Sequence, residues 1–219
     1  MMKNQRGFTL IELAIVLVII GLLLGGVLKG QELINSAKVK NMASDFRNVQ
    51  VQIYSYQDKF RALPGDDGAA INHVGAADNG DADGVIEGAW NSSTQTDESY
   101  NFWQHIRLAG LASGSTTIGD GTYLPTNAEG GRIGIQSNPQ NTIAGLRGSY
   151  AVCSAGILGR FARELDTALD DGNTATGSLM AAANNGVDGT DAADAIVSAG
   201  DPEDVELDPS TPYTVCMAF

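Results

Sequence analysis

Residues 8–28 read FTLIELAIVLVIIGLLLGGVL, an apolar run whose single charged residue is Glu12. At about 1.5 Å per residue, a helix of this length spans roughly 30 Å, the thickness of a bilayer core. The preceding residues 1–7, MMKNQRG, carry the basic side chains of Lys3 and Arg6. Basic residues before a single span keep the N-terminus in the cytoplasm, so the rest of the chain is expected outside.

The junction between these two segments differs from that of an ordinary secretory signal. Such a signal has an apolar region of about 7–15 residues, and its cleavage site lies beyond that region. Here the apolar run is longer, and the small residue Gly7 precedes it. A carboxylate inside an apolar run is costly and suggests a function for Glu12. An acid that snorkels from a helix end to the membrane surface is the alternative.

Residues 6–13, RGFTLIEL, resemble the processing site of type IV prepilins and type II secretion pseudopilins. In that family, a membrane peptidase cuts after the glycine and methylates the new N-terminal residue. The resemblance implies cleavage between Gly7 and Phe8 and N-methylation of Phe8. It also implies that Glu12 neutralises the N-terminal ammonium of a neighbouring subunit during assembly, since two charges in an apolar bundle are tolerated when they pair. Many pilins have a proline that kinks this helix, whereas the first proline here is Pro64.

Beyond residue 28 the helical pattern becomes amphipathic. Apolar residues recur at alternating spacings of four and three, which is the period of one helix face; they are Met42, Phe46, Val49, Ile53, Tyr56 and Phe60. This stripe predicts that residues 29–63 continue the helix and pack on the chain's own globular body. The breaker pair Pro64-Gly65 predicts that the helix ends near Leu63.

Residues 64–219 are expected to form an extracytoplasmic head with many loops, since the chain contains 27 glycines. Two short helices are predicted at 102–111 and 157–169. Strands are predicted at 131–136, 149–155 and 212–219, while residues 181–208 are rich in Ala, Gly and Asp and receive no assignment. The expected inward side chains are Phe102, Ile106 and Ala109 in the first helix, and Ile157, Phe161, Leu165 and Ala168 in the second.

The resemblance to prepilin-type proteins extends into the head. It rests on residues 60–66 (FRALPGD), 103–105 (WQH) with 108–111 (LAGL), and 170–172 (DDG) with 176–177 (TG). The implied fold class is α+β: a long N-terminal stem helix, transmembrane in its first half and amphipathic in its second, packed on an antiparallel sheet in a loop-rich, pilin-like head.

The chain has two cysteines, Cys153 and Cys216, which do not form a CxxC motif. In an extracytoplasmic domain their expected fate is one disulfide, with two unrelated buried thiols as the alternative. The bridge would join the predicted strands 149–155 and 212–219, which are expected to pair.

Residues 79–87, NGDADGVIE, resemble the front of a calcium loop. Side-chain oxygens at alternate positions converge on one cation in such a loop, and a glycine permits the sharp turn. The ligands predicted here are Asn79, Asp81, Asp83 and Glu87, with Asp66, Asp67 or Asp78 as further donors. The match is incomplete, because the first position is Asn79 and the twelfth is Trp90 where a glutamate is usual. A solvated acidic turn is the alternative. Weaker candidates are Asp170, Asp171 and Asn173, and Asp188, Asp191 and Asp194.

Composition and motifs limit the function classes. The chain has 26 Asp and Glu against 13 Lys and Arg, a net charge of -13, so it repels nucleic acid. The only histidines, His73 and His105, belong to no nucleophile motif, and neither an enzyme nor an organic cofactor is predicted.

The sequence therefore predicts a structural subunit of a type IV pilus-like filament. Its expected partners are other pilins or pseudopilins, the prepilin peptidase and an inner-membrane assembly platform. Before assembly it would be a single-pass inner-membrane protein with a periplasmic head, and afterwards part of a periplasmic or cell-surface filament. The alternatives are a type II secretion pseudopilin, a tip-located minor pilin that binds through its acidic loops, and a plain anchored protein. Glu12 argues against the last, since a simple anchor has no need of it.

Overall fold

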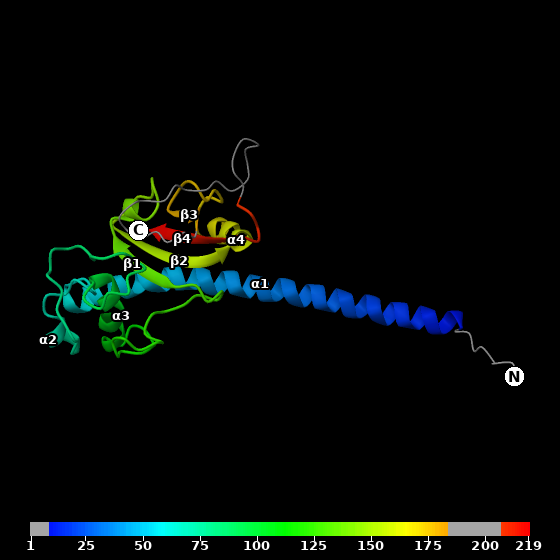
Figure 1. Cartoon of the computed structure of the whole chain (residues 1–219), viewed down its shortest axis with the longest axis horizontal. Helices are drawn as coiled ribbons and strands as arrows, with labels where there is room; N and C mark the ends of the chain where they lie inside the picture. Colours follow the sequence, from blue (N-terminus) through cyan, green and yellow to red (C-terminus); the bar gives the residue numbers. More distant parts are fainter. Residues whose placement is uncertain (1–8, 184–206) are drawn as a thin grey trace. The chain divides into compact units, whose positions relative to one another are not determined.

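The computed structural model describes residues 9–183 and 207–219. The elements, in chain order, are α1 (Leu10–Phe60), α2 (Ala70–Val74), α3 (Glu98–Leu108), β1 (Ile133–Ser137), the 3-10 turn Pro139–Asn141, β2 (Tyr150–Leu158), α4 (Gly159–Leu169), β3 (Leu179–Ala183) and β4 (Pro212–Ala218) (Figure 1). The chain divides into two compact units at Lys38 and Val39. Residues 39–219 are called the head unit below.

The N-terminal part of α1 exposes its apolar side chains. Every large apolar residue from Leu10 to Leu28 is about half or more exposed. The helix is long and apolar enough to cross a membrane, and its most apolar window is not buried by any other described part of the chain. This part of α1 therefore needs lipid or another apolar partner to cover it.

The C-terminal part of α1 is a packed helix of the head unit. The predicted stripe is confirmed, because its members from Met42 to Tyr56 are all buried, and Val39 and Ala43 join them. Phe60 is only half buried. The helix ends at Phe60 and not near Leu63, because Arg61 adopts a left-handed backbone conformation with φ 57°, which cannot continue a right-handed helix.

In the described residues of the head unit, four strands form an antiparallel sheet in the order β1-β2-β4-β3. Because side chains alternate across a strand, the sheet buries two different faces. On one face, Val152 and Val215 join the α1 stripe and Phe161 of α4 in the main core. The α+β class, with the long helix packed on an antiparallel sheet, is confirmed.

The opposite face of the sheet carries the disulfide. Cys153 of β2 and Cys216 of β4 are register partners and form a disulfide, and both are fully buried. The cluster around them contains Trp90, Ile143 and Leu146 from loops, with small residues from the strands. The predicted covalent link between the two strands is therefore present in the structure.

Several predicted boundaries differ from the structure. The first head helix, α3, begins at Glu98 and not at residue 102. Strand β2 runs on to Leu158 through an irregularity in register after Ser154, so Ile157 is a strand residue. In α4 the buried face passes through Phe161, Ala162, Leu165 and Asp166, whereas Ala168 is exposed.

Strand β3 was not predicted. Its sequence, LMAAA, has three alanines, and alanine is depleted in strands. Tertiary pairing decides its conformation, because β3 bonds to β4 along its whole length, from Leu179 opposite Met217 to Ala183 opposite Tyr213.

Candidate functional sites

The start of α1 is a capping box formed by Thr9 and Glu12. The Thr9 backbone N–H and the Thr9 hydroxyl both donate to Glu12 Oε2, each at 2.8 Å. In return, the Glu12 N–H donates to Thr9 Oγ1 at 3.3 Å. This reciprocal pattern satisfies N–H groups that have no partner at a helix start.

The capping box gives Glu12 a role that the sequence analysis missed. Its signal was readable, since Thr-x-x-Glu before an apolar run is the sequence form of a capping box. In the isolated chain, the Glu12 carboxylate therefore holds the helix start in place. The predicted cleavage residues Gly7 and Phe8 lie outside the described residues, and the pairing of Glu12 with a neighbour's ammonium stays a prediction.

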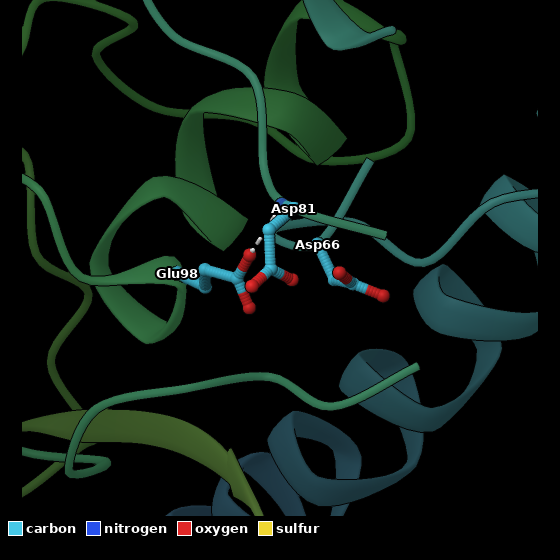
Figure 2. Close-up of side chains that lie close together, drawn as sticks. All are labelled: Asp66, Asp81 and Glu98. Atoms are coloured by element: carbon cyan, nitrogen blue, oxygen red, sulfur yellow. Dashed lines mark hydrogen bonds between the residues drawn. The ribbon is translucent and has the colours of Figure 1, made fainter. Parts of the chain in front are cut away.

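A second candidate site lies in the loops that follow α1. Asp66, Asp81 and Glu98 each place a carboxylate oxygen within 4.8 Å of the other two (Figure 2). Asp66 comes soon after the end of α1, Asp81 lies in the predicted calcium loop, and Glu98 is the first residue of α3. Asp66 and Glu98 are 3% and 7% exposed, whereas Asp81 is exposed.

Two glycines allow these three segments to meet. A Cβ atom at Gly65, which has φ +97°, would lie 2.6 Å from the Glu98 carbonyl oxygen. A Cβ atom at Gly80 would overlap the Asp66 backbone. Only glycine lacks this atom. The backbone beside Asp66 therefore fits closely against α3 and against residues 79–87, which are called the acidic loop below.

The two buried carboxylates hold the acidic loop through backbone N–H groups. Asp66 Oδ1 accepts from Asp83 N–H at 3.0 Å, and its Oδ2 accepts from Gly84 N–H at 2.9 Å. Glu98 accepts from Asp81 N–H at 3.2 Å and from Glu87 N–H at 3.1 Å. Burial raises the pKa of both Asp66 and Glu98, and neighbouring carboxylates add to the rise.

The predicted calcium ligands are only partly brought together. Asp81, Asp83 and Glu87 form an exposed group with carboxylate oxygens within 4.8 Å of one another. The Asn79 Oδ1 atom accepts from the Ile71 N–H at 2.9 Å, so it serves as a loop contact. Glu98 was not predicted as a ligand, because it lies outside residues 79–87 and nothing in the sequence connects it with that loop.

The weaker metal-site candidates are two other groups of acidic residues. Asp170 and Asp171 lie within 4.8 Å of buried Asp166. Asp170 Oδ2 accepts from Ser178 N–H at 2.6 Å, and Asp171 Oδ1 accepts from Asn173 N–H at 2.8 Å, so both organise the turn before β3. The group of Asp188, Asp191 and Asp194 lies outside the described residues.

Both histidines take part in structural contacts. The Gly65 N–H donates to His105 Nδ1 at 2.9 Å in the buried interior. His73 Nδ1 lies 2.7 Å from Asp67 Oδ2, an oxygen that also accepts from the Tyr56 hydroxyl at 2.7 Å. These contacts tie the loop after α1 to the helices.

The family described as "Prokaryotic N-terminal methylation motif" matches residues 2–28. The chain thus carries the signature of type IV prepilins and pseudopilins. This motif supports a structural protein of the type IV pilin or pseudopilin kind, with processing by prepilin peptidase and polymerisation with pilins. A comparison with curated proteins gave no match.

Proposed function

We propose that this protein is a structural subunit of an extracytoplasmic type IV pilus-like filament. Prepilin peptidase removes residues 1–7 and methylates Phe8. The mature chain waits in the inner membrane with its head in the periplasm, and an assembly platform then moves it into the filament. There, the apolar part of α1 exchanges lipid for sister helices.

The proposal is carried by two features that occur together, the methylation motif and an apolar helix whose side chains are exposed. The motif spans residues 2–28, and the same stretch of α1 has no other described segment covering it. A simple membrane anchor would satisfy the apolar surface alone. In such an anchor Glu12 would serve only as the helix cap, which a neutral glutamine also supplies without placing a charge inside that surface, where an unpaired charge is expensive.

The first test is mass spectrometry of the protein from its native host. The expected product begins at N-methylated Phe8. If an active peptidase leaves only the form that begins at Met1, the proposal is wrong. Recovery of the processed chain in filaments sheared from cells would identify a pilus. Its retention in the periplasm would favour a secretion pseudopilus.

The second test separates the two roles of Glu12. Glutamine can replace glutamate in a capping box, so Glu12→Gln retains the helix start but removes the charge. We expect this variant to insert into the membrane and to be lost from filaments, because a neighbour's ammonium has no counter-charge. Glu12→Leu, which removes both features, should insert equally well and also fail to assemble.

Glu32→Gln is the matched control, since Glu32 is an exposed glutamate further along α1 that pairs with Lys29. It should assemble normally. If Glu12→Gln assembles as well as this control while Glu12→Leu does not, Glu12 acts only as a helix cap and the charge-pairing role is refuted.

A further inference from the structure

A cavity of about 380 Å³ is lined by Asp81 and Glu98, two acids of the Asp66–Asp81–Glu98 group. Most of its lining residues carry a side-chain oxygen; among them are Asp78, Asn79, Asp81, Glu87, Glu98 and Asn101. Glu98 and Asn101 are three residues apart on α3, so they lie on the same helix face. Two elements distant in sequence, the acidic loop and α3, therefore line the same cavity.

Asn101 supplies evidence that is independent of the acidic residues. It is 5% exposed, and its side-chain Oδ1 is buried without a hydrogen-bond partner. Buried amide oxygens in folded proteins nearly always have a partner, and an exception requires an explanation such as a bound ion. A cation in the cavity would give this oxygen its partner.

A counter-ion would relieve the repulsion among the carboxylates of the site. Three carboxylates lie within 4.8 Å of one another, and like charges this close repel strongly where water is excluded. Among the ion pairs of the described residues, none joins Asp66, Asp81 or Glu98 to a basic side chain. The sequence offers no Lys or Arg between Arg61 and Arg107.

The donor set selects the kind of cation. Carboxylate and amide oxygens without sulfur or imidazole suit a hard cation. Calcium accepts six to eight oxygens in an irregular arrangement at about 2.4 Å, whereas magnesium demands a near-ideal octahedron. Two oxygens that share a calcium ion are at most about 4.8 Å apart, so the three carboxylates are close enough to share one.

We propose that the head unit binds one calcium ion in this cavity, through carboxylate oxygens of Asp81 and Glu98 and the amide oxygen of Asn101, with Asp66 close enough to these acids to add a further oxygen. Glu98 and Asn101 take the part of the missing acid at position twelve of the loop. Asp66 does not line the cavity, but one of its carboxylate oxygens lies within 4.8 Å of oxygens of Asp81 and Glu98. Glu87 also lines the cavity, and Asp83 is exposed. The proposal concerns the head unit alone and does not depend on the filament role.

The test uses the full-length chain, purified in detergent, stripped of metal and kept in about 0.15 M salt to screen diffuse charge attraction. Isothermal titration with calcium chloride should show one saturable site, with a Kd of roughly 10⁻⁴–10⁻³ M or tighter. Tryptophan fluorescence should show a higher melting temperature in calcium than in chelator. If neither effect appears at calcium concentrations up to about 10 mM, ten times the weaker end of that Kd range, the proposal is wrong.

Three variants locate the site. Asp81→Asn, Glu98→Gln and Asn101→Leu should each weaken calcium binding by about tenfold or more. Asp81 is exposed, so its variant decides the matter if Glu98→Gln fails to fold. Asn101→Leu removes no charge, so a loss of affinity there identifies coordination and not mere attraction by acids.

Asp120→Asn is the matched control for Asp81→Asn. Both acids are exposed and accept from the backbone N–H two residues on, Asp81 from Asp83 at 3.2 Å and Asp120 from Thr122 at 2.8 Å, but Asp120 does not line the cavity. It should bind calcium as the unmodified chain does. Equal affinity in all four variants would overturn the location. Magnesium binding as tight as calcium binding would overturn the choice of ion.

Discussion

Reduction of the Cys153–Cys216 disulfide is expected to lower the free energy of unfolding by about 4 kcal/mol. The cysteines are 63 residues apart. In the chain-entropy relation, closing a loop of this length restricts the unfolded chain by about 4 kcal/mol at 25 °C. For a chain of this size, that loss corresponds to a fall in melting temperature of roughly 8–16 °C.

The effect is expected to act on the unfolded state and to leave the folded sheet intact. Strand β4 pairs with β2 on one side and with β3 on the other, so hydrogen bonds hold it independently of the sulfur atoms. The reduced chain should therefore show the same near-ultraviolet circular dichroism as the oxidised chain at low denaturant. It should unfold at a lower denaturant concentration and expose more surface when it does, which increases the m-value.

The assay is guanidinium unfolding of the oxidised and the reduced chain, followed by tryptophan fluorescence. The double variant Cys153→Ala with Cys216→Ala serves as a comparison, since both residues are fully buried and their truncation adds a packing loss. A difference below about 1 kcal/mol between oxidised and reduced chains would refute the loop-closure argument. A loss confined to the double alanine variant would show that sulfur packing provides the stability.

Two further predictions concern single residues of the head unit. Burial lowers the pKa of His105 to about 4. The unfolded chain, with a histidine pKa near 6.5, therefore binds more protons, and this residue's contribution to stability falls by about 3 kcal/mol as the pH drops from 6.5 to 4. The variant His105→Asn should lack this slope. The test is denaturant unfolding of both proteins across that pH range. Burial raises the pKa of Asp45 and Asp166 to about 6, which has the opposite effect on stability, and subtracting the variant's stability curve from that of the unmodified chain removes this effect. Identical slopes of stability against pH in the two proteins would contradict the prediction. In β1, an added Cβ at Gly134 would overlap the Trp90 carbonyl oxygen, so Gly134→Ala should destabilise by roughly 1–3 kcal/mol. The control Gly121→Ala has open space and should not, and equal melting temperatures for the two would contradict the packing argument.

The stem and the disulfide could be predicted because their signals are local or compositional. The stripe from Met42 to Tyr56 follows the helix period, and a helix with one apolar face must bury that face. The pairing of Cys153 with Cys216 followed from an expected oxidising compartment and the absence of any other cysteine.

The calcium candidate could be predicted only in part, since its donors come from three separate segments. The alternating acids of residues 79–87 are visible in the sequence, but Glu98 and Asn101 belong to another helix. Their approach depends on tertiary contacts at Gly65 and Gly80, which no spacing rule describes. The strand β3 was missed for a related reason, because pairing with β4 and not local propensity determines its conformation.

The disulfide and the proposed calcium site have a common physical logic. Each joins segments that regular secondary structure leaves separate: the disulfide holds the last strand to β2, and the cation would hold the acidic loop to α3 and to the chain after α1. Each also depends on conditions outside the cytoplasm, since a disulfide persists in an oxidising compartment and a weak calcium site fills at millimolar calcium. If the head is exported as proposed, it reaches its full stability only after export. A head held in the cytoplasm, reduced and poor in calcium, should therefore be the less stable form, and only the exported chain would carry a rigid head into the filament.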